Sequence, residues 1–422
     1  MLKQEHLHQG MVLGGAILVF FSIASLINSY GVFLPFISEG MGWSRGAVSG
    51  VQSLCLFLSA VLSPLVGAFI GKYGPRKSII LGGLVVVVGL LGLSQITALW
   101  HLYILWGLLV GGGWAFAQMI PATTVVTNWF VGRRPLALSL VMTSGGVAGL
   151  IAPPIITYTI LSTSWKVSWL FLSAFVLLFC VAIAVFLIKD KPVRIGHHLN
   201  STSGVSSGTN LSGVEGGQIG RPSVFGVMHS FVFWQVVIIS VATLFTFQTI
   251  VVHQVAYLID LGYSPTIAAV IFGLMMGVGI AGRFGYGLLA SKFSRERLVT
   301  VFLGMTMTGI LFLMGAVKSP LLLVYVALFG FGCGALMVAL VDLLVGYYGP
   351  AIYPRLQGWV RLFRTGVGSA PGPWIAGSIH DMTHEYYWAF IIVLGVLSIG
   401  FVVSFFLKPP TARSATFERG RF

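Results

Sequence analysis

The stretch Gly277–Lys292, GVGIAGRFGYGLLASK, places one arginine inside a long apolar run. We interpret it as one end of a membrane-spanning helix, where an arginine near the bilayer centre costs about 2.5–3.5 kcal/mol to insert. Arg283 is therefore expected to face a water-filled cavity that holds a ligand, or to pair with a structural carboxylate. Five glycines surround it: Gly277, Gly279, Gly282, Gly285 and Gly287. They allow another helix or a ligand to approach the backbone closely.

The whole chain has the composition of an integral membrane protein. Of its 422 residues, 57% are hydrophobic and 8% are charged, whereas soluble domains carry about 25% charged residues. The apolar stretches are long and do not alternate, which favours membrane helices over a barrel. The three cysteines lie within these stretches and suggest neither a disulfide nor a metal site. The composition therefore predicts an all-α membrane protein.

Twelve apolar segments are long enough to cross a hydrocarbon core of about 30 Å at about 1.5 Å per residue. They lie at about 11–34, 46–70, 78–96, 100–127, 135–161, 166–188, 229–258, 265–291, 298–317, 320–347, 357–379 and 386–407. No small-residue cleavage site follows the first segment, so we interpret it as a retained helix and not as a signal peptide.

Lysine and arginine are distributed unevenly over the connections. With the N-terminus inside, the inner side holds eighteen of these residues, and the outer side holds three, Arg45, Lys166 and Lys318. Because positively charged loops stay in the cytoplasm, the distribution predicts a multi-pass protein of the cell inner (plasma) membrane with both termini cytoplasmic. It also explains the net charge of +14, which is therefore no sign of nucleic-acid binding.

A polar stretch separates the sixth apolar segment from the seventh. Twelve of the 25 residues from Gly196 to Gly220 are Gly or Ser, which is typical of a flexible linker. We predict an N-terminal six-helix lobe at 1–190, a flexible cytoplasmic linker at 191–228, and a C-terminal six-helix lobe with a cytoplasmic tail at 229–422.

The two halves repeat weakly. GAFIGKYGPRK at 67–77 follows the second segment, and GLLASKFSRER at 287–297 follows the eighth. Both begin with Gly and carry a basic cluster at the same offset. Internal repeats of this kind are typical of two-lobed transporters whose site lies between the lobes. The basic residues of the first copy, Lys72, Arg76 and Lys77, are candidate gating residues.

Six plus six helices, a central linker and the duplicated Gly-to-basic loop resemble the major facilitator superfamily. The resemblance covers nearly the whole chain and implies two pseudo-symmetric six-helix lobes that rock around a midplane site. In that superfamily an acidic residue normally stands four positions after the Gly. Here Gly71 and Ser291 occupy those positions, so only the basic half of the loop motif carries over.

Within the superfamily, several stretches are similar to bacterial monocarboxylate transporters and the related oxalate/formate exchangers. They are YGVFLPFISEGMGWSRGAVSG at 30–50, TNWFVGRRPLALSLVMTSGGVAG at 127–149, and HQVAYLIDLGYSP at 253–265 followed by GRFGYGLLASKF at 282–293. In monocarboxylate transporters the equivalent of Arg283 binds the substrate carboxylate, and an aspartate of helix seven takes part in proton coupling. The resemblance implies these roles for Arg283 and Asp260.

The chemistry of these side chains supports the same roles. The planar guanidinium of Arg283 can hold a carboxylate through two charge-assisted hydrogen bonds. If Asp260 pairs with Arg283, moving the arginine onto a substrate would let Asp260 take a proton; the alternative for Asp260 is a solvated helix end. His253 lies seven residues earlier, on about the same helix face. It is a candidate substrate-binding residue, or a hydrogen-bonded packing residue.

The eleventh segment carries two further arginines. Oxalate exchangers have a second cation six residues after a Gly in this helix, and here Gly358 is followed by Arg364. The resemblance therefore makes Arg364 a candidate for binding a second anionic or polar group. We expect Arg361 to extend to the cytoplasmic interface and Asp342 to neutralise one of these arginines.

Polar residues inside other segments are candidates for the same pocket, although such residues also bond across helices. They are Asn28, Tyr30, Gln52, Trp114, Gln118, Asn128 and Gln248. Of these we select Asn28, Tyr30 and Gln118 as substrate-binding candidates.

Three intramembrane arginines against Asp260 and Asp342 favour an anionic substrate. Without a G-x-x-x-x-G-K-[ST] loop, a gradient would drive transport, and no nucleophile–base set suggests an enzyme. We expect a proton-coupled carrier of a small monocarboxylate of the lactate or pyruvate type, monomeric in the lipid bilayer, with no cofactor, metal or nucleic acid. The alternatives are exchange of a dicarboxylate such as oxalate for a monocarboxylate, and a non-transporting membrane sensor.

Overall fold

The computed structural model describes residues 2–130, 134–190, 224–315, 320–349, 356 and 359–409. All regular secondary structure in these residues is helical, which confirms the predicted all-α class. Residues 191–223 of the predicted linker lie outside the described part, and Val224–Met228 form the short helix α10. The boundaries of the predicted domains stay predictions.

The first half of the described chain forms six spans, two of which contain π-helical stretches. The helices are α1 (Leu2–Met41), α2 (Arg45–Tyr73), α3 (Pro75–Leu93), α4 (Leu99–Leu102), η1 (Tyr103–Val110), α5 (Gly111–Ala117), α6 (Met119–Trp129), α7 (Arg134–Ser162), α8 (Trp165–Val176), η2 (Leu177–Ala182) and α9 (Ile183–Phe186). The fourth span runs from α4 to α6 and the sixth from α8 to α9.

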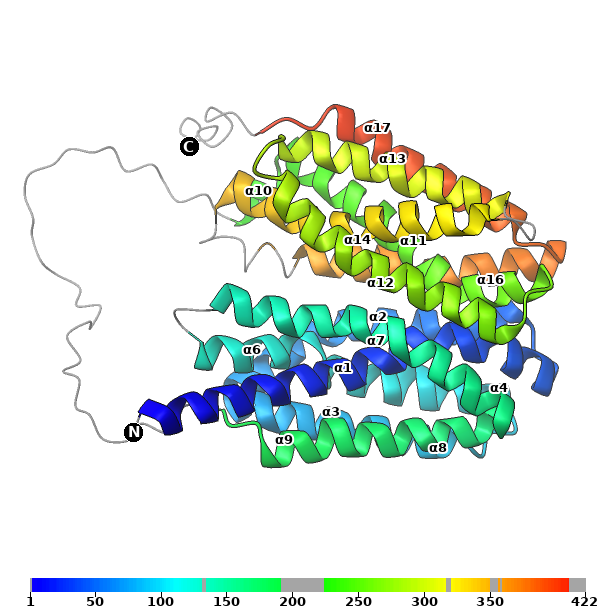
Figure 1. The fold of residues 1–422 in the computed structure, drawn as a ribbon, viewed down its shortest axis with the longest axis horizontal. Coiled ribbons are helices and arrows are strands. Elements are labelled where there is room, and N and C mark those ends of the chain that lie inside the picture. The colour runs from blue at the N-terminus through cyan, green and yellow to red at the C-terminus, as the bar shows by residue number, and fades with distance from the viewer. Residues whose placement is uncertain are drawn as a thin grey trace, which may run out of the picture.

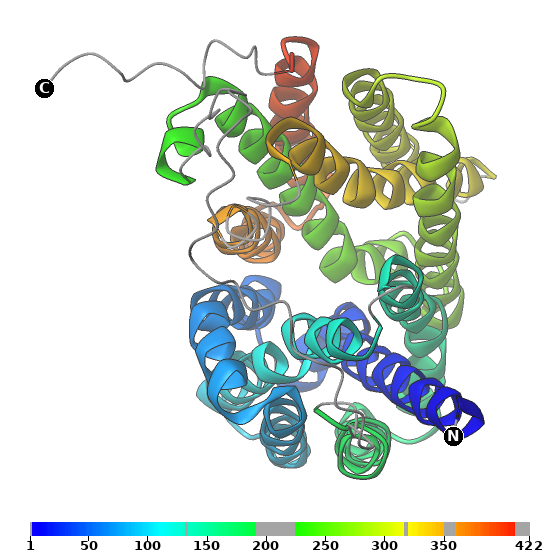
Figure 2. The same ribbon diagram turned by 90° about the vertical axis from the view of Figure 1, so that its left-hand side faces the viewer.

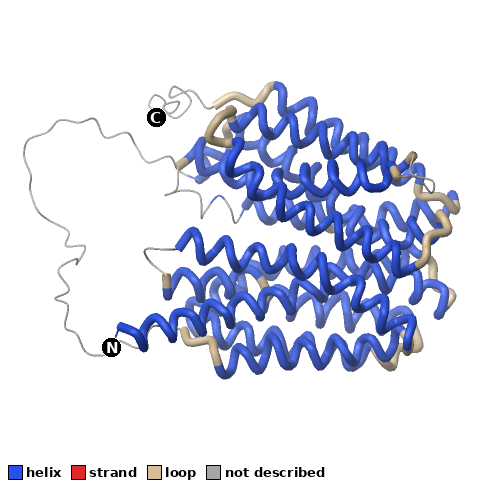
Figure 3. Tube along the Cα trace, viewed as in Figure 1, coloured by secondary structure: helices blue, strands red, loops and turns tan. Residues whose placement is uncertain are grey.

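The second half mirrors this arrangement after α10. The helices are α11 (Phe231–Asp260), α12 (Pro265–Leu289), α13 (Arg295–Met314), α14 (Leu321–Tyr348), η3 (Leu362–Ser369), α16 (Pro371–Thr383) and α17 (Tyr387–Phe405). Figure 3 shows the described chain as helices joined by short loops.

Eleven helical segments of the described chain are long and apolar enough to cross a membrane. The eleventh predicted segment, 357–379, is not among these eleven and corresponds to the π-helical η3 followed by α16. Pro371 and Pro373 begin α16 and lack the N–H group that would continue an α-helical ladder. The sequence therefore predicted a single helix where the structure has two consecutive ones.

Several helices begin at serine residues that cap them. The Ser44 hydroxyl accepts a hydrogen bond from the Ala47 N–H at 3.2 Å, and Ser230 accepts one from Phe233 at 3.2 Å. Ser264 does the same for α12 at 3.3 Å. Such caps satisfy backbone donors that a helix leaves unpaired at its start. They fix where α2, α11 and α12 enter the bundle.

The helices form two lobes, α1–α9 and α10–α17, shown below and above in Figure 1. We call the end with Lys72, Arg76 and Lys77, where the chain also begins, the basic end, and the other end, with Arg45 and Asp260, the opposite end. The ribbons of the lobes lie close together toward the opposite end and diverge toward the basic end. Figure 2, viewed from the basic end, shows the two lobes as separate groups.

One close contact between the lobes lies where α1 crosses α11. A Cβ atom at Gly31 would overlap the backbone carbonyl oxygens of Val251 and Val252. Because backbone cannot move aside as a flexible side chain can, only glycine fits at this crossing. The crossing closes the space between the lobes on the side of the opposite end.

We predict that Gly31→Val destabilises the purified protein by about 1–3 kcal/mol, because overpacking forces backbone apart. Thermal unfolding in detergent would measure the loss. Gly14→Val is the matched control, since it makes the same change in the same helix at a position with nothing within 4 Å. Equal unfolding temperatures for the two variants would contradict the close crossing.

Candidate functional site

Arg283 lies on α12 in the C-terminal lobe, against α7 of the N-terminal lobe. Its Nη1 atom donates a hydrogen bond to the Met142 carbonyl at 3.3 Å, and a Cβ atom at Gly146 would lie 3.3 Å from the same nitrogen. Among the described residues, no carboxylate forms an ion pair with Arg283. A guanidinium has five N–H donors, and the bond to the Met142 carbonyl is the one hydrogen bond that Arg283 makes among the described residues.

Asn28, on α1, reaches the same turn of α7 as Arg283. Its Nδ2 atom donates to the Gly145 carbonyl at 3.3 Å, and its side chain is partly exposed. The turn from Met142 to Gly146 therefore carries an amide from one lobe and a guanidinium from the other. Of the residues predicted to bind substrate, the structure brings these two together.

Asp260 does not pair with Arg283, and that predicted pairing was wrong. Its carboxylate instead forms a two-point ion pair with Arg45, with Oδ1 2.7 Å from Nη2 and Oδ2 bonded to Nη1. Asp260 ends α11 at the opposite end, whereas Arg283 stands eighteen residues after Pro265, the first residue of α12. At about 1.5 Å per residue, this places Arg283 about 27 Å along α12 from that end.

The ion pair belongs to a larger contact between the lobes, which we call the opposite-end lock: Arg45 of α2 with Asp260, His380, Asp381 and Tyr386 of the other lobe. Asp381 accepts hydrogen bonds from the backbone N–H groups of Arg45 at 2.9 Å and Gly46 at 2.7 Å, and so caps α2 across the interface. Nη1 of Arg45 also lies 3.2 Å from both His380 Nε2 and the Tyr386 hydroxyl.

Sequence reasoning treated Arg45 only as an outer basic residue and missed this role. One signal was present in the sequence. A cation in the first turn of a helix is disfavoured by the helix dipole, so an arginine directly after the capping Ser44 indicates an acidic partner elsewhere. The sequence offered no indication of which acids, because Asp260 and Asp381 lie in the other half of the chain.

His253 is fully buried and both of its ring nitrogens are engaged. Nε2 lies 2.8 Å from the Pro373 carbonyl and Nδ1 lies 3.0 Å from the Tyr386 hydroxyl. The carbonyl can only accept, so Nε2 carries the proton and Nδ1 accepts from the tyrosine. Burial raises the pKa of the Tyr386 hydroxyl, which stays a donor. In this structure His253 occupies the packing position given as the alternative above.

Tyr30 and Gln118 do not hydrogen-bond to Arg283 either. Tyr30 is fully buried, its hydroxyl donates to the Val48 carbonyl at 2.6 Å, and its ring centroid lies 4.7 Å from that of Trp106. Gln118 is partly exposed and stands where the fourth span breaks between α5 and α6. Tyr30 therefore packs α1 against α2, while Gln118 has no hydrogen-bond partner for its side chain among the described residues.

At the basic end, Asp342 also has partners other than those predicted. Asp342 accepts hydrogen bonds from Arg295 Nε at 2.6 Å and the Tyr286 hydroxyl at 2.7 Å. The prediction that Asp342 neutralises Arg361 or Arg364 was wrong, since its ion pair among the described residues is with Arg295 of α13. Arg364 lies in η3 and is partly buried; Gly358, which defined its spacing, lies outside the described residues.

The loop after α2 contains no acidic residue, and an aspartate from another part of the chain binds it instead. Asp190, at the end of the sixth span, accepts a hydrogen bond from the Arg76 backbone N–H at 2.8 Å. The Arg76 guanidinium donates to the carbonyls of Ala184 at 3.2 Å and Val185 at 2.6 Å. Lys72 lies 5.0 Å from the Tyr73 ring centroid, and Lys77 is exposed. Arg76 thus ties the start of α3 to the end of the sixth span.

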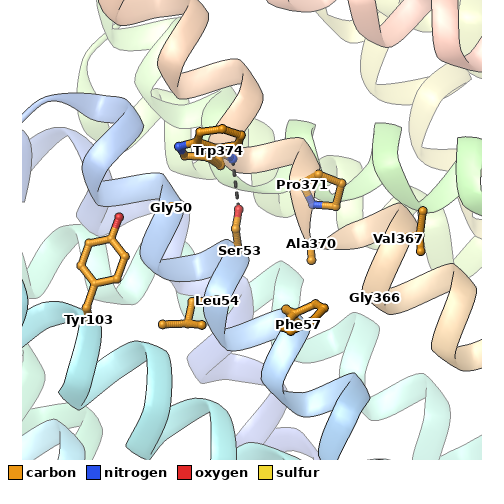
Figure 4. A pocket seen from close by; sticks show the side chains of 10 residues that line it. All are labelled: Gly50, Ser53, Leu54, Phe57, Tyr103, Gly366, Val367, Ala370, Pro371 and Trp374. Atoms are coloured by element: carbon orange, nitrogen blue, oxygen red, sulfur yellow. Dashed lines mark hydrogen bonds between the residues drawn. The ribbon is translucent and has the colours of Figure 1, made fainter.

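A separate hollow of about 480 Å³ lies between α2 and the η3–α16 region. Figure 4 shows its lining, which is mostly apolar. The Ser53 hydroxyl accepts from the Trp374 N–H at 3.1 Å, and the Tyr103 hydroxyl donates to the Ala47 carbonyl at 3.1 Å. Because its lining carries no charge, this hollow does not suit a carboxylate.

Comparison with known proteins agrees with this architecture. The sequence model of the Major Facilitator Superfamily matches residues 15–364 and, in a second match, 286–421. Two solved structures share the fold: a point mutant of the nucleoside transporter NupG, with TM-score 0.75 and 11% identity, covering 94% of this chain and 99% of that one; and a bacterial homolog of the human lysosomal transporter Spinster, with TM-score 0.72 and 13% identity, covering 96% and 97%.

Curated relatives include transporters named for monocarboxylates. Monocarboxylate transporter 13 of Bos taurus is 27% identical over 385 residues, covering 90% of this chain and 84% of the relative. Monocarboxylate transporter 2 of Mesocricetus auratus is 27% identical over 374 residues, covering 85% and 75%. The MFS transporter asaE of Aspergillus flavus is 26% identical over 396 residues, covering 91% and 84%.

Two helical lobes joined around an interfacial arginine define a multi-pass membrane transporter, not an enzyme. The chain belongs to the major facilitator superfamily, and its relatives include monocarboxylate transporters. The predicted superfamily and fold are thereby confirmed.

We predict that Asp260→Asn increases the open population of the opposite end about fivefold, corresponding to the roughly 1 kcal/mol expected of a partly exposed ion pair. Spin labels on the exposed residues Glu39 and Met382 would report the distance between the lobes. Arg295→Gln is the control, because it breaks an ion pair within one lobe. An unchanged distance distribution in Asp260→Asn would show that the lock does not hold the lobes together.

Proposed function

We propose that this protein carries a small monocarboxylate across the cell inner (plasma) membrane together with a proton, working as a monomer by alternating access. The observation that carries the proposal is Arg283, whose guanidinium lies between the lobes with no carboxylate partner in the described chain. A cation held at this depth is costly unless it serves a ligand or a counter-ion. The relatives named as monocarboxylate transporters support a carboxylate as that ligand.

The position of Arg283 suits alternating access. It belongs to the C-terminal lobe and bonds to α7 of the N-terminal lobe at Met142, so a rocking motion between the lobes changes its surroundings. A substrate carboxylate would replace the weak 3.3 Å bond to a carbonyl with a two-point, charge-assisted contact. Differential binding of this kind lets a ligand shift the balance between two states.

Proton coupling is assigned to Asp260 by a different route from its predicted pairing with Arg283. The Asp260 carboxylate is partly exposed at the opposite end and attracts Arg45. A proton on Asp260 removes this charge, which weakens the lock and favours opening of that end. With both termini cytoplasmic, the opposite end faces outward. Protons from outside would then promote the outward-open state.

We predict that Arg283→Ala lowers uptake of labelled lactate into proteoliposomes on the order of a hundredfold, as expected when one partner of a shielded charge pair is lost. Arg283→Lys keeps the charge but loses the planar fork, so its uptake should lie between that of wild type and that of Arg283→Ala. Arg297→Ala, at an exposed position of α13, is the control. Near-normal uptake by a correctly inserted Arg283→Ala protein would exclude this residue from the substrate site.

We also predict that acid on the outer side drives lactate accumulation, and that Asp260→Asn flattens this dependence because asparagine resembles the protonated acid. Lactate uptake measured under imposed pH gradients of different size tests this dependence, and Asp342→Asn is the control. Accumulation driven by acid inside would contradict proton symport.

Strict exchange without pH dependence, tested with oxalate and formate, would favour the dicarboxylate exchanger instead. Anion binding with no transport would indicate a membrane sensor.

A further inference from the structure

The apolar hollow between α2 and the η3–α16 region has walls from both lobes. Leu54 and Phe57 line it on the side of the N-terminal lobe, and Val367, Pro371 and Trp374 line it on the other side (Figure 4). Its volume is about 480 Å³, whereas an engineered apolar cavity of about 150 Å³ already binds benzene. Because apolar space without an occupant forfeits van der Waals contacts, a hollow of this size is a candidate binding site.

The hollow lies at the depth of the hydrocarbon core. Its α2 wall, residues 50–57, extends from about 7 Å to about 18 Å along the helix from Arg45, the first residue of α2 at the opposite end. The hydroxyls of Ser53 and Tyr103 in the lining are already engaged in hydrogen bonds to other parts of the chain. The remaining lining is apolar and aromatic, so the hollow suits an apolar occupant.

The rim of the hollow continues into the lipid-facing surface. Phe57, Val367 and Trp374 are 52%, 58% and 54% exposed, although they line the hollow. Val61 and Leu65 follow Phe57 at intervals of four residues, so they lie on the same face of α2, and both are exposed. The hollow is therefore an indentation of the surface that bilayer hydrocarbon covers.

The width of the hollow excludes a protein helix as its occupant. A volume of about 480 Å³ along a wall about 10 Å long corresponds to a mean cross-section of about 48 Å². An α-helix with its side chains is about 10–12 Å across and needs about 80 Å² or more. The acyl chains of the bilayer are narrower than a helix and are present at this depth.

We propose that one acyl chain of a membrane phospholipid occupies this hollow and contacts both lobes at once, with its head group in the leaflet at the opposite end. The proposal does not depend on which substrate is carried. The two walls are held close together beside the site, because the Trp374 N–H donates to Ser53 at 3.1 Å. One turn further toward the opposite end, a Cβ atom at Gly377 would lie 2.8 Å from the Cα atom of Gly46.

The test uses a phosphatidylethanolamine that carries a photoreactive diazirine in the middle of one acyl chain. The intact protein is reconstituted with this probe in vesicles of phosphatidylethanolamine and phosphatidylglycerol, extracted and washed in mild detergent, and irradiated. Mass spectrometry of its peptides should find label on α2 around Phe57 and on η3 around Val367, several-fold above that on Leu288 and Phe405. These two comparison residues lie outside the hollow but are more exposed, at 74% and 63%.

Gly366→Leu fills part of the hollow and should remove the excess label from both walls. A Cβ atom at Gly366 would come no closer than 3.8 Å to another part of the chain, at Ala60, so there is room for the larger side chain. Gly395→Leu is the matched control, because it makes the same change at an exposed position of α17 where a Cβ atom would meet nothing within 4 Å. It should leave the label unchanged.

Label on the two walls no stronger than that on Leu288 and Phe405 would overturn the proposal, and this comparison in wild type needs no variant to fold. Label confined to one wall would overturn the contact with both lobes. Excess label that persists in a Gly366→Leu protein with the unfolding temperature of wild type would exclude the hollow as its source. None of these measurements involves transport, so this proposal and the proposed function fail separately.

Discussion

The closed opposite end organises the rest of this structure. There, Arg45 of one lobe meets Asp260, His380 and Tyr386 of the other, while Asp381 caps the first turn of α2. Such a cluster combines charge attraction with satisfaction of backbone donors, and both are stronger away from bulk water. Because it depends on charge, it can be released by a proton, whereas a purely apolar contact cannot.

Beneath the lock, the crossing of α1 and α11 makes the closure tight. Glycine at position 31 lets the two backbones lie so close together that no side chain fits between them. Asn28 and Arg283 lie on the basic-end side of this crossing. Lock, crossing and site thus lie in sequence along one axis, which is the arrangement expected of a carrier that exposes one site to one side at a time.

Each lobe uses a half-buried acid near the basic end, and the two acids bind different partners. Asp190 closes the loop after α2 by binding the start of α3, while Asp342 binds Arg295 and Tyr286 in the other lobe. Both lie at the end of a span and not within the repeated Gly-to-basic loop. The acid that the superfamily normally places in that loop is therefore replaced in space by residues elsewhere in the chain.

The sequence by itself determined the class and the spans, because hydrocarbon imposes its constraints locally and a spanning helix must be apolar over its length. It also singled out Arg283 as a candidate site residue, because a charge inside such a helix is costly. It did not determine partners. Asp260 pairs with Arg45 and not with Arg283, and Asp190 reaches Arg76 across 114 residues. Such pairings depend on which helix ends coincide after packing, and helix ends distant in sequence carry no mutual signal. Only the tertiary structure decided that His253 packs within one lobe, whereas Asn28 and Arg283 meet across two.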